Sequence, residues 1–408
     1  MRERKRDGVS VEEAVGRILD AVSPIERILE LPLLECVGRV LAEDRYAGID
    51  NPPFDRAPVD GYACRAFDTK EASKAKPVVL KVLREIDAGG YFEGTVGPGE
   101  AVRIMTGAPI PSGCDVCIRQ EDTDYGEEFV RVYEEYAAYQ NYCYAGEDFK
   151  KGQLMVKAGS RLTYVEIAVL ASMGAETLPV YDKPAVALFT TGDEIVMPGK
   201  PLRPGKIYNS NLPGLAARMQ ELGFRPILAK QIGDEGAAVA EEIRNALAIA
   251  DVVITTGGVS VGKKDILHDA LPLLQAERKF WGVAMKPGTP VIFSVYKGKP
   301  IISLSGNPFG ALTNFELLIR PMLAKLCRDE SLIPVRREAV MAAEFGKASH
   351  GRRFIRAIYR EGRVYLPEGL HSSGVLASMR GCNCLVDIVP GTECLKPGDK
   401  VSVVMTCR

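Results

Sequence analysis

The chain has 408 residues, with 52 basic and 53 acidic side chains and a formal net charge of −1. This balance argues against a general nucleic-acid-binding protein, because such domains are usually strongly basic, and no apolar run approaches the ~18 residues of a membrane span. A hydrophobic fraction of 46% and ten cysteines without framework spacing predict a cytoplasmic protein with folded cores, free thiols and about three domains.

The first elements belong to a domain that is split in the sequence. Ser10 and Glu13 form the pattern of a capping box, followed by an apolar helical face up to residue 19. The adjacent prolines Pro52 and Pro53 mark a boundary, because neither fits inside a helix or a central strand. A second helix is expected over 164–173. We therefore assign residues 1–50 and 147–180 to one domain.

Residues 51–146 are predicted to form a β-rich domain. Short apolar alternations in this part of the chain are divided by glycine and proline, which is the pattern of strands joined by turns. The last part of the chain, 331–408, repeats this pattern of short strands and turns and predicts a C-terminal β-barrel.

Residues 181–330 alternate buried strands with amphipathic helices. This order is typical of a doubly wound, mostly parallel α/β sheet. The expected strands are 185–189, 226–229, 251–254, 291–295 and 301–304, and the expected helices are 212–222, 237–250, 266–274 and one after 308. The fold class is therefore a multi-domain α/β protein with an inserted β-rich domain and a terminal barrel.

Three polar or glycine-rich loops follow the predicted strands of this α/β domain. Ligands bind at the carboxyl ends of the strands in such a sheet, and glycines let backbone N–H groups approach an anion closely. Any one loop alone is better explained as a tight turn between strand and helix, but three at one sheet edge favour a phosphate or nucleotide site. The residues are Thr191, Gly192, Asp193 and Glu194; Gly257, Gly258, Ser260 and Gly262; and Ser305, Gly306 and Asn307.

Acidic residues recur at the same edge of the predicted sheet. Asp193, Glu194, Asp234 and Asp265 supply the oxygen ligands that Mg²⁺ prefers beside phosphates, although Asp234 and Asp265 also precede predicted helices, where Asp is a good cap. Lys286 stands in a Lys-Pro-Gly turn, where it either neutralises a bound oxyanion or is simply solvated.

Other common catalytic patterns are missing from the sequence. The three histidines are isolated, and the cysteine pairs 114/117 and 382/384 lack a second pair at zinc-finger spacing. The sequence has neither a Gly-x-Ser-x-Gly elbow nor a Walker A loop. Zinc, serine-hydrolase and P-loop chemistry therefore lack support.

Taken in order, the motifs resemble the molybdopterin molybdenumtransferase family, which includes MoeA and the gephyrin E domain. The resemblance runs over roughly residues 10–405. It is carried by the blocks 53–63 (Pro-Phe-Asp-Arg-Ala-Pro-Val-Asp-Gly-Tyr-Ala), 103–108 (Arg-Ile-Met-Thr-Gly-Ala), 146–148 (Gly-Glu-Asp), 191–194, 207–211 (Ile-Tyr-Asn-Ser-Asn), 257–262 with Asp265, 285–288 (Met-Lys-Pro-Gly) and 305–308.

The resemblance implies an elongated homodimer of four-domain subunits. Its active cleft would lie between the second domain of one subunit and the third and fourth domains of the other. There it would bind adenylylated molybdopterin and molybdate, insert the metal and release AMP with the help of Mg²⁺.

The resemblance also implies roles for individual residues. Asp60, Thr106 and Asp148 would serve from the second domain, and Glu194, Asp234 and Asp265 from the third, with Asp265 and Asp234 as magnesium ligands. Lys286 would contact molybdate or phosphate. The fourth domain would add Arg352 or Arg353, together with Ser373.

Several positions depart from the family pattern. Tyr142 and Tyr144 stand where arginines are usual, and Thr289 replaces a second lysine. Asn209 replaces an expected Asp, and Gly310 replaces a small hydroxyl residue. Loss of charged contacts worth ~1.5–3 kcal/mol each weakens oxyanion binding. Tungstate as the oxyanion, or an impaired paralogue acting as a pterin-nucleotide-binding, scaffold or regulatory protein, therefore remains the alternative to a molybdate-inserting enzyme.

Overall fold

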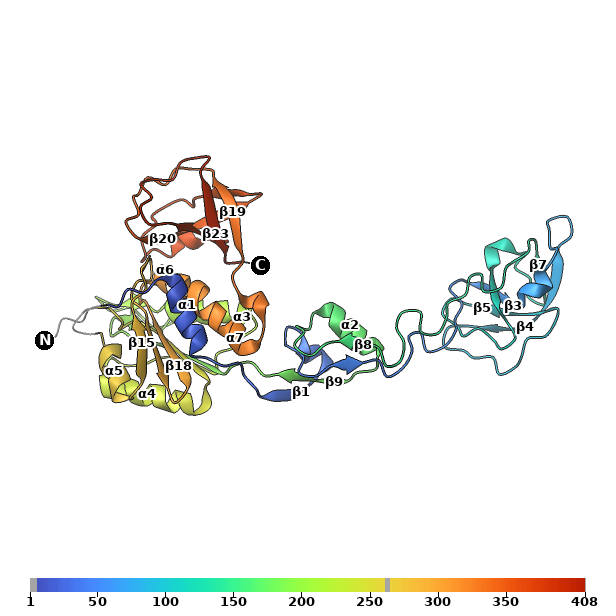
Figure 1. Cartoon of the computed structure of the whole chain (residues 1–408), viewed down its shortest axis with the longest axis horizontal. Helices are drawn as coiled ribbons and strands as arrows, with labels where there is room; N and C mark the ends of the chain where they lie inside the picture. The colour runs from blue at the N-terminus through green and yellow to red at the C-terminus, as the bar shows by residue number, and fades with distance from the viewer. Residues whose placement is uncertain (1–5, 261–264, 408) are drawn as a thin grey trace. The chain divides into compact units, whose positions relative to one another are not determined.

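The computed structural model describes residues 6–260 and 265–407, which form two compact units (Figure 1). The first unit comprises residues 1–29, 38–40 and 179–408, and the second comprises 30–37 and 41–178. The chain passes between the units in two strands that pair with each other, β1 (Ile28–Pro32) and β9 (Thr177–Tyr181). Within the described residues, no helix has both the length and the apolar character needed to cross a bilayer.

A six-stranded mixed sheet forms the centre of the first unit. Its strands lie in the order β13 (Leu228–Gln231), β10 (Val186–Thr190), β14 (Val252–Thr256), β18 (Lys299–Leu304), β17 (Ile292–Tyr296) and β15 (Glu277–Trp281). The first four are parallel, whereas β17 pairs antiparallel with both β18 and β15. The mostly parallel α/β sheet is confirmed, and β15 is a strand that the sequence pattern did not reveal.

Helices cover both faces of this sheet because residues in its strands alternate between two cores. Val186 and Leu188 face one core, and Ala187 and Phe189 face the other. The first core is closed by α1 (Val11–Asp20), α3 (Asn211–Glu221), α6 (Pro308–Asn314), the π-helical segment η4 (Phe315–Ile319) and α7 (Arg320–Cys327). The second is closed by α4 (Gly236–Ile249) and α5 (Leu267–Leu273), on the opposite face in Figure 1.

The start of α1 shows half of the predicted capping box. The Ser10 hydroxyl accepts a hydrogen bond from the Glu13 backbone N–H at 3.0 Å. The Glu13 carboxylate instead pairs with Arg17 one turn later, at 2.6 Å. The reciprocal bond is therefore replaced by an i,i+4 ion pair, which stabilises the same turn.

The C-terminal part of the first unit is a closed barrel. Strand β22 pairs with both β23 and β20, which closes the order β20-β21-β19-β23-β22 around an apolar core. The strands are β19 (Arg336–Met341), β20 (Arg352–Arg360), β21 (Arg363–Tyr365), β22 (Cys384–Ile388) and β23 (Lys400–Met405), with the short helices η5 (Glu330–Leu332) and η6 (Ala377–Met379) nearby in sequence. Strand β16 (Met285–Lys286) from the α/β part pairs with β20 and joins the barrel to it.

The second unit is built around a five-stranded sheet. The order is β6 (Val116–Arg119), β3 (Gly61–Cys64), β5 (Glu100–Ile104), β4 (Val78–Ile86) and β7 (Phe129–Val132). Tyr62 and Cys64 contribute to one apolar core and Ala63 to another, so the sheet is covered on both faces. The unit also contains β2 (Arg45–Tyr46), β8 (Leu154–Val156), α2 (Tyr164–Ser172), η1 (Leu33–Cys36), η2 (Ala66–Thr69) and η3 (Gln120–Asp122).

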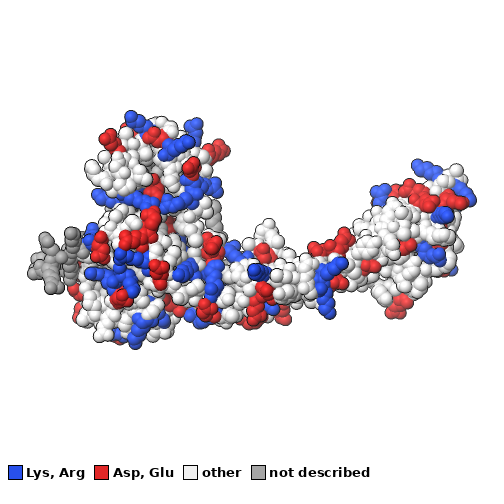
Figure 2. Space-filling view, in the orientation of Figure 1, with Lys and Arg blue, Asp and Glu red and all other residues white. Residues whose placement is uncertain are grey.

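Charged side chains of both signs are mixed over the surface of each unit. Figure 2 shows basic and acidic groups interspersed on the drawn face, as expected from the 52 basic and 53 acidic residues.

Candidate functional site

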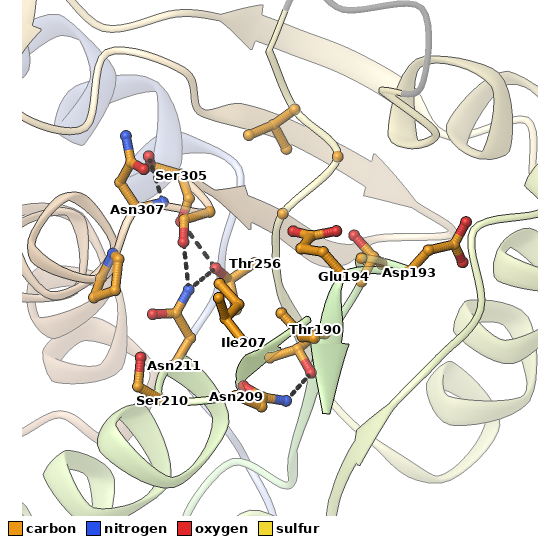
Figure 3. Close-up of a pocket in the computed structure, with 18 of the residues that line it drawn as sticks. Thr190, Asp193, Glu194, Ile207, Asn209, Ser210, Asn211, Thr256, Ser305 and Asn307 are labelled. Carbon is orange, nitrogen blue, oxygen red and sulfur yellow. Dashed lines mark hydrogen bonds between the residues drawn. The ribbon is translucent and has the colours of Figure 1, made fainter. Parts of the chain in front are cut away.

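A hollow of about 860 Å³ opens at the carboxyl ends of β10, β14 and β18 in the first unit (Figure 3). This is the edge at which ligands bind in doubly wound sheets. The three predicted loops all contribute to its lining, with Thr191, Gly192, Asp193, Glu194, Gly257, Gly258, Ser260, Ser305, Gly306 and Asn307. Gly262 lies outside the described residues.

A hydrogen-bond network ties these loops together beneath the hollow (Figure 3). The Asn211 amide nitrogen donates to the Thr256 hydroxyl at 3.0 Å and to the Gly306 carbonyl at 2.8 Å. The Thr256 hydroxyl in turn donates to the Ser305 carbonyl at 2.8 Å. Because one side chain bonds to two loops, Asn211 sets the spacing between the loops after β14 and β18.

A parallel pair of short strands brings a fourth segment to the hollow. Strands β11 (Ile195–Val196) and β12 (Ile207–Tyr208) pair, and the buried Asn209 after β12 donates to the Thr190 hydroxyl at 2.7 Å. Lys206, just before β12, donates to the Asp193 carbonyl at 2.5 Å. Lys206 is the one basic side chain among the described lining residues.

Four acidic residues are among those that line the hollow: Asp193, Glu194, Asp234 and Asp265. The Asp234 carboxylate accepts a hydrogen bond from the Asp193 backbone N–H at 2.8 Å. Burial, with the charges of Asp193 and Glu194, raises the pKa of Asp234. Clustered carboxylates of this kind favour a proton or a bound cation on Asp234.

The acidic residues of the hollow offer the kind of oxygen ligand that Mg²⁺ takes. Among the described residues, no group of three or more His, Cys, Asp or Glu side chains is arranged to hold a metal ion. Mg²⁺ is usually held by only one or two carboxylates, with water and substrate phosphate completing its shell. Asp234 and Asp265 in one hollow fit that requirement.

The barrel also reaches this hollow. Gly374 and Leu376 line it, and the neighbouring Ser373 is fixed to the loop after β18. Its hydroxyl accepts a hydrogen bond from the Asn307 amide nitrogen at 3.2 Å, and its carbonyl accepts one from the Phe309 N–H at 3.1 Å. The structure therefore brings the predicted Ser373 to the site.

The predicted basic residues of the site lie elsewhere in the first unit. The Arg352 guanidinium donates to the Asp387 carboxylate at 2.7 and 2.8 Å and pairs with Glu12 at 2.5 Å. Arg353 donates to the Ala348 carbonyl at 3.2 Å. The exposed Lys286 lies on β16 opposite Arg353. None of the three is among the described residues that line the hollow.

Two of the predicted residues in the second unit meet each other. The Asp60 carboxylate accepts hydrogen bonds from the Thr106 N–H and hydroxyl, both at 2.7 Å. These bonds lower the pKa of Asp60, and the bond from the Thr106 hydroxyl has the larger effect. Asp148 bonds separately, accepting from the Asn51 amide nitrogen at 2.8 Å.

The two tyrosines that depart from the family pattern, Tyr142 and Tyr144, cluster with Tyr139 in the second unit. The rings of Tyr139, Tyr142 and Tyr144 lie 5.0–5.7 Å apart, centroid to centroid. The Tyr142 hydroxyl donates to the Asp55 carboxylate at 2.5 Å. Burial and this carboxylate raise the pKa of Tyr142, so the phenol stays protonated.

Sequence reasoning missed several residues that line the hollow. Thr190 and Thr256 are the last residues of buried strands. Asn209 and Asn211 belong to the block 207–211, which was noted only for its resemblance, and Lys206 directly precedes that block. A run of polar residues between a strand and a helix was the available signal, because buried side-chain amides need partners.

The chain is similar to known proteins over nearly its whole length. Three family models match: the MoeA N-terminal region (domain I and II) at 9–174, a probable molybdopterin binding domain at 187–325, and the MoeA C-terminal region (domain IV) at 338–405. Molybdopterin molybdenumtransferases of Staphylococcus aureus (strain COL) and Staphylococcus epidermidis (strain ATCC 12228 / FDA PCI 1200) are each 35% identical over 98% of this chain and 96% of their own length.

The fold is also similar to solved structures over nearly the whole chain. Two solved structures of a molybdopterin biosynthesis MoeA protein from Pyrococcus horikoshii match with TM-scores of 0.83 and 0.79, at 34% and 31% identity. They cover 98% of this chain and 99% and 100% of theirs.

Proposed function

The chain belongs to the molybdopterin molybdenumtransferase (MoeA) family of molybdenum cofactor biosynthesis, and on this premise we propose that it inserts molybdate or tungstate into adenylylated molybdopterin with Mg²⁺-dependent release of AMP. The observation that carries this proposal is the single hollow in which glycine-loop backbone and the acids Asp234 and Asp265 converge. A pyrophosphate needs both kinds of group, because its oxygens accept N–H donors and its charge requires a cation.

Each part of the hollow has a role in this reaction. The loop residues Gly257, Gly258 and Ser260 bind phosphate oxygens, and Asn211 holds the facing loop at a constant spacing. Asp234 and Asp265 would hold Mg²⁺, which supplies neutralisation of the negative charge that builds up as the phosphate bond breaks.

The proposal includes a homodimer in the cytoplasm, with Asp60, Thr106 and Asp148 acting from the second domain. Lys286 would contact molybdate or phosphate, and the fourth domain would add Arg352 or Arg353 with Ser373. The Asp60–Thr106 pair supports the role given to Asp60, because the Thr106 hydroxyl and N–H keep the Asp60 carboxylate ionised and oriented. Light scattering of the purified protein tests the dimer, and a monomer at micromolar concentration would contradict it.

The enzyme is tested by incubating the protein with adenylylated molybdopterin, Mg²⁺ and either molybdate or tungstate. AMP is measured by chromatography, and active cofactor by reconstitution of a molybdenum enzyme. We expect Asp265→Asn to lower AMP release at least tenfold. Asp20→Asn, which neutralises an exposed acid on α1, serves as the matched control and should not change it.

A binding protein without turnover is the competing function. It is favoured by the scarcity of cations, since Lys206 alone among the described lining residues is basic. Tight binding of adenylylated molybdopterin with no AMP release at any concentration of either oxyanion would eliminate the enzyme and establish this alternative.

A further inference from the structure

The residues just ahead of the matched family regions are bound to the α/β sheet. The first family match begins at residue 9. Before it, the Asp7 N–H donates to the Trp281 carbonyl, and the Trp281 N–H donates to the Asp7 carboxylate, both at 2.8 Å. Val9 continues the pairing by accepting from the Ala284 N–H at 2.8 Å. Because Asp7 is bound to Trp281 through both its N–H and its carboxylate, the position of the adjacent Arg6 backbone is fixed.

Arg6 is directed at the glycine-rich loop of the hollow. Its guanidinium Nη2 donates to the Ser260 hydroxyl at 3.1 Å. Its stem packs on Gly282 so closely that a Cβ there would lie 3.0–3.3 Å from the Arg6 Cβ, Cγ and Cδ. Within 6–260 and 265–407, no carboxylate forms an ion pair with Arg6, and its buried Nε has no hydrogen-bond partner. Among the described residues, the charge of Arg6 is therefore not paired with a carboxylate, and its guanidinium lies 5.8 Å from the Trp281 ring centroid, beside a residue that lines the hollow.

Two aromatic side chains, Trp281 and His268, contact the backbone carbonyl groups of the loop that contains Ser260. The Trp281 indole N–H donates to the Val259 carbonyl at 3.1 Å, and His268 Nε2 lies 3.1 Å from the Ser260 carbonyl oxygen. The two rings contact edge to face, with centroids 4.3 Å apart. In a planar trans peptide the C=O and N–H groups point to opposite sides. Fixing the Val259 carbonyl on Trp281 therefore turns the Ser260 N–H away from the indole.

We propose that Arg6 and Ser260 form an anion subsite of the hollow that takes a phosphate group of a nucleotide, with Trp281 and His268 as positioning residues. The Ser260 oxygen accepts from Arg6, which leaves its own O–H to donate to a phosphate oxygen. The guanidinium behind it adds a positive charge within a few ångströms of that oxygen. The inference rests on the proposed function, because the nucleotide in question is the adenylyl part of the substrate.

The subsite is tested by titrating AMP and adenosine into wild type and Arg6→Gln by calorimetry. The two ligands differ by the phosphate alone. We expect Arg6→Gln to weaken AMP binding about tenfold, equivalent to ~1.4 kcal/mol, and to leave adenosine binding unchanged. Arg6→Lys should recover part of the loss. The matched control is Arg17→Gln, which removes an exposed guanidinium that donates to the Lys279 carbonyl on β15, and it should behave as wild type.

The positioning role is tested with Trp281→Phe, which keeps an aromatic ring beside His268 but removes the N–H donor together with part of the buried indole volume. We expect AMP affinity to fall and adenosine affinity to stay the same, a selective loss that general destabilisation does not produce. Trp281 is the single tryptophan of the chain. In wild type, its fluorescence should therefore change with AMP and not with adenosine.

Three results would overturn the subsite: no AMP binding by wild type, unchanged AMP affinity in Arg6→Gln, or equal loss of AMP and adenosine affinity. Turnover separates this inference from the proposed function. If wild type releases AMP from adenylylated molybdopterin but Arg6→Gln binds AMP normally, the subsite is wrong and the function stands. If wild type binds AMP through Arg6 but releases none, the function fails and the subsite stands.

Discussion

Substituting Gly257 by alanine tests whether the loop after β14 depends on close backbone contact. Gly257 has φ of +97°, and a Cβ placed there would lie 2.6 Å from the Thr191 carbonyl oxygen and 2.9 Å from its hydroxyl. Both partners are held in place, because the Thr191 N–H donates to the Thr256 carbonyl at 3.0 Å and the Gly257 N–H donates to the Leu304 carbonyl at 3.2 Å.

The cost has two parts of known size. A left-handed conformation costs a residue with a Cβ ~1–2 kcal/mol. The contact with Thr191 falls about 0.8 Å short of the 3.4 Å limit of ordinary packing, and forcing such an overlap in packed surroundings costs a further ~1–3 kcal/mol. We therefore expect Gly257→Ala to lower the free energy of unfolding by ~2–5 kcal/mol and to displace the loop that binds phosphate.

Gly199→Ala is the matched control. Gly199 has φ of +91°, and a Cβ there would meet no atom within 4 Å. It shares the conformational cost and the unfolded-state entropy of Gly257→Ala, so the difference of ~1–3 kcal/mol between the two variants isolates the contact. Urea unfolding measures stability, and calorimetry with AMP measures the site. Equal stability of the two variants, with AMP affinity retained in Gly257→Ala, would refute the reasoning.

Three further predictions concern ionised groups. Burial raises the pKa of Asp234, so the folded protein binds this proton more tightly than the unfolded chain does. The stability that the protonated carboxyl contributes at low pH is therefore lost as pH rises through the folded pKa. In urea unfolding, Asp234→Asn should be more stable than wild type at pH 8 but not at pH 4, and its AMP release should fall at least tenfold. Glu316→Ala should lower the free energy of unfolding by ~3–5 kcal/mol, because the buried Glu316 bridges the buried Arg320, at 2.8 Å, and the partly buried Arg218, at 2.6 Å; a loss below 1 kcal/mol would contradict this. Although burial opposes ionisation, hydrogen bonds from Arg352 help lower the pKa of Asp387, so its contribution is present at neutral pH and lost as pH falls through the folded pKa; thermal unfolding should show a smaller stability loss on acidification in Asp387→Asn than in wild type.

Local pattern was sufficient for the architecture of the α/β part. Strand residues such as Val186 and Ala187 face opposite cores, and this alternation follows from the backbone alone. Its loops were predictable for the same reason, because the carboxyl ends of parallel strands meet at one edge. Strand β15 was missed because its residues, Glu277–Trp281, are mostly polar, and an edge strand needs only one apolar face.

The site was predictable only where residues belong to one loop or follow neighbouring strands. Asp193, Asp234 and Ser260 were found in this way and line one hollow. Lys286 and Arg352 were expected at the hollow from motif order, but neither is among the described residues that line it. Lys286 lies on β16, which pairs with β20, and Arg352 forms an ion pair with Asp387. Such partners are chosen by tertiary packing, which motif order does not describe.

The sequence by itself determined the order of the strands and helices, the polar loops between them and the family to which the chain belongs, because each depends on residues close together in the chain. Only the tertiary structure decided that Asn211 bonds to Gly306 and that Arg6 reaches Ser260, 254 positions away. A hydrogen bond depends on where two side chains meet in space, and that position is set by the packing of every element between them.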